Sequence, residues 1–463
     1  MNRLIISDIQ TGAHVHFIGI GGAHMRGHAE QMHNSGYIVS GSDHKASAAT
    51  EQLAAMGIRV AIGHARENLA AGTALVIYTA AVPPDNAELA AAREQNIPLM
   101  ERAEFLGQLM KNYKHPVCVA GTHGKTTATS MTAEIFLAAD ADPTIAIGGI
   151  LPSIGSGLRD GGRDAFIVES CEYCDTFLRF FPYIGVILNV DFDHADYFAD
   201  LAHIYQSFRR FAERIPAEGA LVINGTIERL AELTSALPCR VVTVDAPAAN
   251  WFATDIVYDA NGCASFTAQH NGMTLGTVRL SVPGRHNVSN ALAAMAAASL
   301  LGIAFDAMTA GLARFGGAKR RYDRKGVTAA GVTIIDDFAH HPTEIRTTLA
   351  AAKSADFGRV VCIFQPHTRS RTQELFNEFS ACFDDADEVV LLDIYEPAGR
   401  EEHSYSIHSR DLAQSLAARG VRVFYADSFG VAAAWVQKNC LHNDVCITMG
   451  AGNVSELGAI LLS

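Results

Sequence analysis

Residues 117–127 read Val-Cys-Val-Ala-Gly-Thr-His-Gly-Lys-Thr-Thr, a β-rich apolar run followed by a glycine-rich turn and the start of a helical stretch. Glycines let the backbone curl so that its N–H groups face a phosphate, and a helix N-terminus adds partial positive charge. The stretch ends in Gly-Lys-Thr, as in the general phosphate-binding loop GxxxxGKT, but with a shorter spacing from the first glycine. Lys125 can therefore reach the β- and γ-phosphates of a nucleotide, and the Thr126 hydroxyl can bind Mg²⁺. This order of strand, turn and helix predicts a P-loop-type α/β unit.

The same alternation of short β-rich runs and Ala/Leu-rich helical stretches continues on both sides and indicates parallel sheets covered by helices. At about 150 residues per domain, the 463 residues suggest about three domains. We expect an N-terminal unit over residues 1–112, a central unit over 113–315 and a C-terminal unit over 316–463. The segment 240–282 is punctuated by glycines and predicts an antiparallel piece. The expected strands are 15–18, 37–39, 75–78, 117–120, 165–168, 185–188, 332–335, 360–364, 389–392 and 445–449, and a helix is expected over 287–301.

Composition excludes several classes of protein. Apolar residues make up 49% of the chain and charged residues 18%, which is typical of a globular protein. A net charge of −13 argues against general nucleic-acid binding. The first twenty residues lack the pattern of a signal peptide, and the apolar run 291–305 is shorter than the roughly 18 residues of a spanning helix. Nine scattered cysteines do not suggest a disulfide framework. We expect a soluble cytoplasmic protein without membrane insertion.

Acidic residues follow two of the expected strands. Glu169 and Glu172 come directly after the strand 165–168, and the run 189–194, Asn-Val-Asp-Phe-Asp-His, follows the next one. Ligands of open α/β sheets collect at the carboxyl ends of the strands. Carboxylate, hydroxyl and phosphate oxygens suit Mg²⁺, for which a histidine is a less usual ligand. Together with the phosphate loop, these acids favour a site for a metal-bound nucleotide.

Several ordered runs give the chain a resemblance to the Mur ligase family, the ATP-dependent enzymes that form peptide bonds in cell-wall precursor synthesis. The resemblance covers nearly the whole chain, and so many ordered matches are highly specific. The runs are 16–22, 101–107, 120–127, 189–194, 283–290, 336–344, 364–367 and 448–452.

The resemblance implies an α/β protein of three domains. These are an N-terminal Rossmann-like domain for the UDP-substrate, a central P-loop ATPase-like domain with a mainly parallel sheet, and a C-terminal Rossmann-like domain. The C-terminal domain would close over ATP and bind the amino acid. The implied substrates are UDP-N-acetylmuramate and L-alanine, with ATP and Mg²⁺, and the implied protein is a monomer or homodimer. The muramoyl carboxylate would attack the γ-phosphate of ATP, and the amine of L-alanine would then displace phosphate from the acyl phosphate.

The resemblance also implies roles for single residues. Thr126 and Glu169 would hold Mg²⁺ at the γ-phosphate, His194 would be a ligand of a second ion, and Glu172 is a further candidate. Arg371 would lie where the incoming amino acid binds. Its guanidinium suits the carboxylate of that amino acid, because the two groups can form a bidentate pair. The implied catalytic residues are Lys125, Glu169, His194, His367 and Arg371, and the implied nucleotide-binding residues are Gly121, Thr122, His123, Gly124, Lys125, Thr126, Thr127, His286, Asn287, Arg321 and Asp337.

The glycine-rich run near the N-terminus marks the expected UDP-substrate site, which comprises Gly19, Gly21, Gly22 and Asp43. Two residues beside this run depart from the family pattern. His24 stands where the family has glycine or serine, and Arg26 stands where a serine is usual. Both would lie near the UDP pyrophosphate, where extra positive groups could suit a diphosphate.

Two further comparisons with the family pattern concern the rest of the chain. Asn453 stands where the C-terminal signature usually has aspartate. Other Mur ligases use a carbamylated lysine after the Asp-His pair, whereas residues 195–219 contain no lysine. This absence agrees with the branch of the family that adds L-alanine.

Four alternatives stay open at this point. The run 19–24 followed by Asp43 could be a dinucleotide fingerprint of a dehydrogenase, although the third glycine is missing. Cys171 and Cys174 form a CxxC pair that could be redox-active or half of a zinc site, although no second pair completes it.

The departures at His24, Arg26 and Asn453 could mark a nucleotide-binding paralogue without ligase activity. Within the family, the alternative is a recycling ligase that attaches a whole tripeptide to UDP-N-acetylmuramate.

Overall fold

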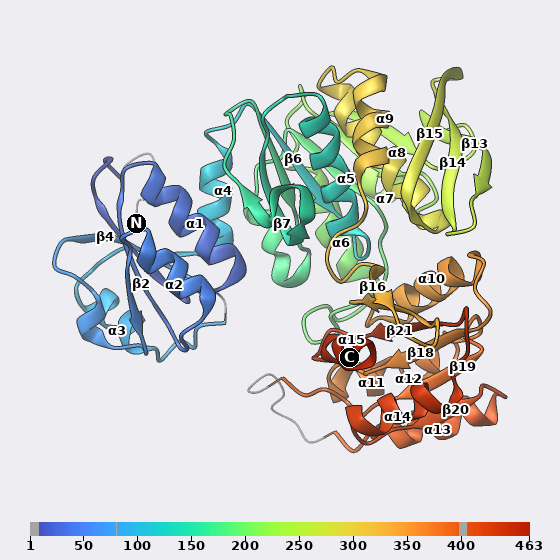
Figure 1. The fold of residues 1–463 in the computed structure, drawn as a ribbon. Coiled ribbons are helices and arrows are strands. Elements are labelled where there is room, and N and C mark those ends of the chain that lie inside the picture. The colour runs from blue at the N-terminus through green and yellow to red at the C-terminus, as the bar shows by residue number, and fades with distance from the viewer. Residues whose placement is uncertain (1–8, 80, 398–404) are drawn as a thin grey trace.

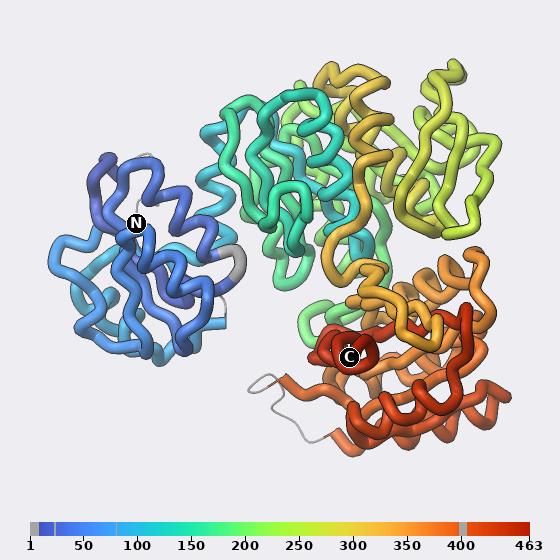
Figure 2. Tube along the Cα trace, in the orientation of Figure 1, coloured from blue at the N-terminus to red at the C-terminus, as the bar shows by residue number. Residues whose placement is uncertain are grey.

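A computed structural model describes residues 9–79, 81–397 and 405–463 of the chain, without the side chains of residues 23 and 24. The departure at His24 therefore lies outside the described side chains. The chain forms three α/β lobes, each with its own sheet, and the central lobe is joined to both others (Figure 1). Figure 2 shows the same arrangement as a trace, with the N-terminal lobe in blue and the C-terminal lobe in orange to red. The expected fold of three α/β units with mainly parallel sheets is confirmed.

The N-terminal sheet is parallel throughout, in the order β3-β2-β1-β4-β5. Side chains alternate between the two faces of a strand. On β1, Val15 and Phe17 accordingly pack on one face with α1 and α4, while Ile18 packs on the other face with α3. The strands are β1 (His14–Ile18), β2 (Ile38–Asp43), β3 (Arg59–Ile62), β4 (Thr73–Tyr78) and β5 (Leu99–Glu101), and the helices are α1 (Ala23–Asn34), α2 (Ala48–Ala55), η2 (Arg66–Asn68), α3 (Ala87–Glu94) and α4 (Arg102–Met110).

The central lobe contains a ten-stranded sheet in the order β15-β14-β13-β12-β11-β10-β6-β9-β7-β8. Val117 and Val119 of β6 pack with α5, α8 and α9, whereas Cys118 and Ala120 pack with α6 on the opposite face. The strands are β6 (His115–Ala120), β7 (Thr144–Leu151), β8 (Ser156–Arg159), β9 (Ala165–Glu169), β10 (Ile184–Ile187), β11 (Ala220–Asn224), β12 (Arg240–Val244), β13 (Trp251–Tyr258), β14 (Cys263–His270) and β15 (Met273–Pro283). The helices are α5 (Lys125–Ala138), η3 (Pro152–Ile154), η4 (Tyr173–Arg179), α6 (Leu201–Ala212), α7 (Leu230–Thr234), α8 (Arg285–Leu300) and α9 (Phe305–Arg314).

Most of the predicted antiparallel piece over 240–282 is present. The strands β13, β14 and β15 pair antiparallel, but β12, which starts at Arg240, still pairs parallel with β11. The β7–β8 hairpin at the other edge was not predicted. The parallel strands between these edges include the neighbours β6, β9 and β10, whose carboxyl ends therefore meet at one edge of the sheet.

The C-terminal lobe has six strands in the order β16-β17-β21-β18-β19-β20, with β16 as an antiparallel edge strand. Ile345 and Leu349 of α10 pack on one face of the sheet, while Val436 of α14 and Leu457 of α15 pack on the other. The strands are β16 (Asp323–Val327), β17 (Thr333–Asp337), β18 (Val360–Phe364), β19 (Glu388–Leu391), β20 (Val423–Tyr425) and β21 (Val445–Met449), and the helices are α10 (Pro342–Lys353), α11 (Arg369–Glu374), α12 (Phe376–Ser380), α13 (Ser409–Ala418), α14 (Phe429–Asn439) and α15 (Ser455–Leu462).

Among the described residues, no helix has both the length and the apolar character that crossing a membrane requires.

Candidate active site between the central and C-terminal sheets

The predicted phosphate loop connects the end of β6 with the start of α5. Gly121 and Gly124 have φ angles of 148° and 80°, in the region that favours glycine, and this lets the loop turn sharply into the helix. Gly124 is the N-cap of α5, and no side chain caps the helix there. The N–H groups of the first turn are thus left for a ligand, and anions bind readily at such helix ends.

Lys125 lies within this loop and makes an ion pair with a buried carboxylate. Its Nζ donates to Glu172 Oε2 at 2.8 Å and to the Gly121 carbonyl at 2.7 Å. The Lys125 and Glu172 side chains are 13% and 2% exposed. Burial alone would lower the pKa of Lys125, but the charge of Glu172 outweighs burial and raises it. Lys125 is therefore fully charged, as a phosphate ligand must be.

Glu169 and Thr126, two of the residues predicted to hold Mg²⁺, lie side by side. Glu169 Oε1 lies 3.0 Å from Thr126 Oγ1, and Glu169 Oε2 accepts a hydrogen bond from Gly148 N at 2.6 Å. Neighbouring oxygen ligands of an octahedral Mg²⁺ lie about 3 Å apart when each is about 2.1 Å from the ion. The oxygen donors and their spacing therefore fit Mg²⁺. His194 lies close by, with Nε2 3.6 Å from Glu172 Oε1.

His123, the third residue of the loop, lies between two carboxylates. Its Nε2 is 3.2 Å from Asp191 of the central lobe, and its Nδ1 is 3.5 Å from Glu344 of α10. Burial would lower the pKa of His123, but hydrogen bonds to Asp191 and Glu344 outweigh burial and raise it to about 9. His123, Asp191 and His341 also bring ligand atoms within 4.8 Å of one another, as a metal site would require. Because His123 pairs with a carboxylate from each lobe, we interpret the group as an ionic contact between the two lobes.

A cavity of about 310 Å³ lies between the central and C-terminal lobes. Arg321 reaches Glu344 at 3.8 Å, and buried Asp337 accepts from Tyr322 N at 2.9 Å. Burial raises the pKa of Asp337 to about 6. The structure thus brings seven of the eleven predicted nucleotide residues, from both lobes, to one cavity, whose lining does not include Gly121, Thr122, Lys125 or Thr126. Of the predicted set, its lining includes His123, Gly124, Thr127, His286, Asn287, Arg321 and Asp337.

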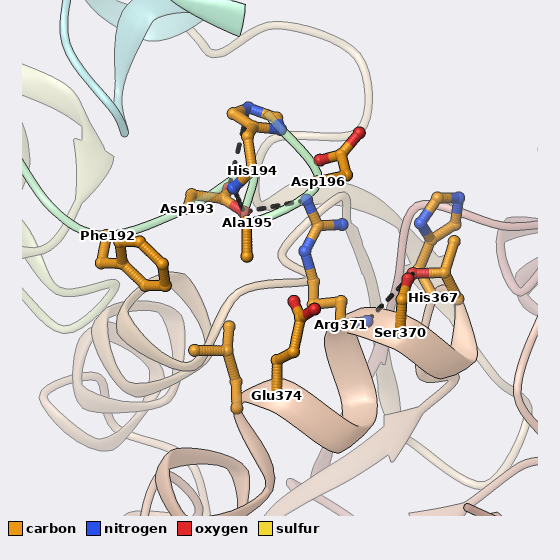
Figure 3. Close-up of a pocket in the computed structure, with 11 residues that line it drawn as sticks. Phe192, Asp193, His194, Ala195, Asp196, His367, Ser370, Arg371 and Glu374 are labelled. Atoms are coloured by element: carbon orange, nitrogen blue, oxygen red, sulfur yellow. Dashed lines mark hydrogen bonds and ion pairs between the residues drawn. The ribbon is translucent and has the colours of Figure 1, made fainter. Parts of the chain in front are cut away.

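A second, smaller cavity of about 80 Å³ lies beside Arg371 (Figure 3). Figure 3 shows Arg371 pointing from α11 toward the loop of Asp193 and His194, and an ion pair of 2.9 Å joins Arg371 to Asp193. His367 lines the same cavity and is buried. The predicted residues His194, His367 and Arg371 are therefore brought together from two lobes.

The predicted UDP-substrate residues form a glycine turn at the carboxyl end of β1. Asp43 Oδ2 accepts a hydrogen bond from Gly21 N at 2.8 Å, so Asp43 supports the turn directly. Gly22 is the N-cap of α1, which begins beside the turn. Arg26 contacts Gln52 at 2.8 Å and Glu30 at 3.2 Å, so this departure from the family pattern has partners within the N-terminal lobe.

The other departure from the family pattern, Asn453, lies in the C-terminal lobe. Asn453 Oδ1 accepts from Gln365 Nε2 at 3.1 Å. Neither Cys171 nor Cys174 is in a disulfide, and burial raises the pKa of Cys171 to about 11, which disfavours a reactive thiolate.

Four residues of the site were not assigned a role from the sequence. Asp191, Asp193, Thr343 and Glu344 all lie in runs that carry the family resemblance, and all make contacts between the lobes. Thr343 Oγ1, for example, donates to Asp191 Oδ2 at 2.6 Å. The many polar residues in those runs were the signal in the sequence that could have pointed to these four residues. Their contact partners could not be predicted, because they come from distant parts of the chain.

Comparisons with known proteins agree with this architecture. Three family models match in order: the Mur ligase family catalytic domain over residues 14–114, the Mur ligase middle domain over 119–298, and the Mur ligase glutamate ligase domain over 320–452. A UDP-N-acetylmuramate–L-alanine ligase from Agathobacter rectalis is 49% identical over 98% of this chain and 99% of its own length. One of the same name from Clostridium perfringens is 46% identical over 97% of both chains.

Two solved structures are similar to the whole chain. The crystal structure of a UDP-N-acetylmuramate-alanine ligase from Thermotoga maritima matches with a TM-score of 0.79 and 26% identity, over 96% of this chain and 97% of that one. A murein peptide ligase from Psychrobacter arcticus matches with a TM-score of 0.69 and 25% identity, over 97% of this chain and 98% of that one.

Proposed function

This chain belongs to the Mur ligase family, and on that premise we propose that it joins L-alanine to the carboxylate of UDP-N-acetylmuramate at the expense of ATP. The products are the amide, ADP and phosphate, and the reaction belongs to peptidoglycan precursor synthesis. Two relatives that cover nearly the whole chain, at 49% and 46% identity, carry the name of this activity. The cytoplasm as the location, and a monomer or homodimer as the assembly, stay predictions.

The first proposed step is formation of an acyl phosphate. A carboxylate is a poor acyl donor, so its oxygen attacks the γ-phosphate of ATP, ADP leaves, and the carboxylate oxygen becomes part of a good leaving group. The protein must mainly position the partners and neutralise charge on the phosphoryl oxygens. In this proposal Lys125 and the N–H groups at the start of α5 bind those oxygens. Thr126 and Glu169 would hold Mg²⁺, which when bound supplies further positive charge to the phosphates.

The second proposed step is attack by the amine of L-alanine on the acyl carbon, which expels phosphate. The amine must lose a proton, and a neutral histidine can accept it. Burial lowers the pKa of His340 to about 4, so this ring is neutral near pH 7, and the negative charge of bound phosphates would have to raise that pKa for the ring to accept the proton. Its Nδ1 contacts the Phe338 carbonyl at 2.9 Å, which leaves Nε2 as the basic nitrogen. Both ring nitrogens of His341 are occupied, by Thr343 N and the Phe192 carbonyl.

The single observation that carries this proposal is the small cavity beside Arg371, whose guanidinium can bind the carboxylate of a free amino acid. The test is phosphate release from ATP with Mg²⁺, UDP-N-acetylmuramate and one amine at equal concentration. The panel contains L-alanine, glycine, L-serine and the L-Ala-γ-D-Glu-diaminopimelate tripeptide. We expect L-alanine to give the highest kcat/KM. Glycine should be used less well, because one methylene is worth roughly 1–3 kcal/mol.

A second candidate is the recycling ligase that uses the tripeptide, since a murein peptide ligase shares the fold over 97% of this chain. In the tripeptide the carboxylate of the alanine residue is already amidated, so that residue would offer Arg371 no carboxylate to bind. A higher kcat/KM for the tripeptide would replace our proposal with this one. Absence of phosphate release with every amine would instead favour a nucleotide-binding protein without ligase activity.

A further inference from the structure

Arg371 is already paired with a carboxylate in the ligand-free protein. Arg371 Nη2 lies 2.9 Å from Asp193 Oδ1, and the two side chains are 14% and 8% exposed. Asp193 belongs to the loop after β10 in the central lobe, and Arg371 belongs to α11 in the C-terminal lobe. Because the pair is buried, neither charge can lose its partner without a replacement.

The contacts of Asp193 favour the charged form of its carboxyl group. Its Oδ1 also accepts a hydrogen bond from His194 N at 2.7 Å. The ion pair with Arg371 and this hydrogen bond both favour the charged carboxylate, which is a suitable partner for a cation.

We propose that Asp193 and Arg371 together form a receptor for the zwitterion of a free α-amino acid, with the carboxylate on Arg371 and the α-ammonium group on Asp193. This inference rests on the proposed function and adds the residue that recognises the amino group. In the free protein the two halves of the receptor neutralise each other. Entry of the zwitterion replaces one ion pair by two, so that no charge is left unpaired in the buried cavity.

The position of Asp193 also suits the chemistry that follows. His367 lines the same cavity as Asp193, and the centroid of the His340 ring lies 6.0 Å from that of His367. An ammonium group held on Asp193 would therefore lie in the cavity whose wall continues to the proposed proton acceptor. Asp196 and Glu374 are the other carboxylates that line the cavity, and Glu374 serves as the matched alternative in the test.

The test measures binding of three small probes to the full chain loaded with a non-hydrolysable ATP analogue, Mg²⁺ and UDP-N-acetylmuramate. L-Alanine carries both charges, L-lactate lacks the ammonium group, and L-alaninamide lacks the carboxylate. We expect wild type to bind L-alanine more tightly than either single-charge probe. Equal affinity for all three would overturn the receptor without the use of any variant.

The variants assign each charge to a residue. Asp193→Asn should weaken L-alanine and L-alaninamide by about 10- to 100-fold and leave L-lactate unchanged or tighter, because a hydrogen bond to a charged group is lost. Arg371→Met should weaken L-alanine and L-lactate but not L-alaninamide. In turnover, Asp193→Asn should raise the KM for L-alanine and leave the KM for ATP unchanged. Asp193→Glu, which keeps the charge, should retain part of the preference for L-alanine.

Two results would contradict the inference. One is an equal loss of affinity for all three probes in Asp193→Asn, which would indicate a structural role for Asp193. The other is that Glu374→Gln, rather than Asp193→Asn, weakens binding of L-alanine and L-alaninamide, the two probes that carry an ammonium group. The proposed function is judged separately, by phosphate release in wild type. If the probes bind as expected while the tripeptide is the better substrate, the proposed function fails and the receptor stands.

Discussion

Substitution of Lys125 should affect both activity and stability, because this residue is paired with a buried carboxylate. Its ammonium group is paired with Glu172, which is 2% exposed, so removal of the lysine leaves a buried carboxylate with only His194 Nε2, at 3.6 Å, beside it. We expect Lys125→Met to lower kcat by about 10²–10³, because a donor to developing phosphoryl charge is lost. We also expect a loss of about 3–5 kcal/mol in stability, because Glu172 loses its main cation. Phosphate release and thermal unfolding measure the two effects.

The double variant Lys125→Met/Glu172→Gln separates these effects. It removes both charges, so most of the lost stability should return while activity stays low. Near-normal turnover of the single variant would show that Lys125 does not bind the transferred phosphate.

His123 carries the pH dependence of the contact between the central and C-terminal lobes. Its pKa in the folded protein is about 9, above an ordinary value of about 6.5. The stability it contributes is therefore fully present below about pH 6.5 and lost as the pH rises through about 9. The contribution is at most about 3 kcal/mol. We expect the thermal midpoint of wild type to fall over this range, and that of His123→Asn to be flatter.

Glu344→Gln gives the matched control for His123. Without the charge of Glu344 the His123 ring should titrate at lower pH, and the loss of stability should shift in the same direction. NMR titration of the His123 ring measures this directly. An unshifted titration in the variant would mean that Glu344 does not stabilise the protonated ring.

At this scale the sequence predicted residue types and their grouping better than their partners. The run 189–194 and the phosphate loop were both assigned to the site. The contacts of Asp193 with Arg371 and of Asp191 with Thr343 join residues 178 and 152 positions apart. Such pairs depend on how two lobes pack, and no local pattern encodes that packing.

At the scale of elements, α4 shows how a single glycine fixes a contact between lobes. An added Cβ at Gly107 would overlap the carbonyl oxygen of Arg179 in η4. We expect Gly107→Ala to destabilise the protein by about 1–3 kcal/mol, because the backbone of one element must shift. Gly430, in α14, is the control, since an added Cβ there meets no atom within 4 Å. Gly430→Ala should be neutral or stabilising by about 0.5–1 kcal/mol.

Thermal unfolding compares the two glycine variants. Equal midpoints for Gly107→Ala and wild type would mean that α4 and η4 do not pack as described.

The elements themselves were predictable where their apolar periodicity is strong. The buried strands β6, β18 and β21 lie where their runs of valine and isoleucine placed them. The short strand β5 and the β7–β8 hairpin were missed. β5 has only three residues, and β7 contains two adjacent glycines, so neither carries a clear β pattern. Their strand structure comes from pairing with neighbours, which overrides local preference.

At the scale of the whole molecule, each of the three lobes binds a different reactant in our proposal. In our proposal the UDP-substrate is held by the N-terminal lobe, the phosphates by the central lobe and the amino acid mainly by the C-terminal lobe. The N-terminal lobe contacts the central lobe through α1, where Gln31 donates to Asp160 at 2.8 Å. The C-terminal lobe contacts it through the pairs of His123 and Arg371. A nucleotide that enters the cavity between these lobes must therefore rearrange the existing contacts.

This division predicts a change of shape on ligand binding. The carboxylate, the γ-phosphate and the amine must meet within about 3–3.5 Å to react, and we expect the lobes to move together to bring them there. We expect solution scattering to give a smaller radius of gyration with ATP analogue, Mg²⁺ and UDP-N-acetylmuramate together than without ligands, and an intermediate change with either ligand alone. Lys125→Met should still contract with both ligands, because binding rather than chemistry drives closure. The same radius with and without both ligands would mean that the lobes are fixed, and the substrates would then have to meet in the arrangement of Figure 1.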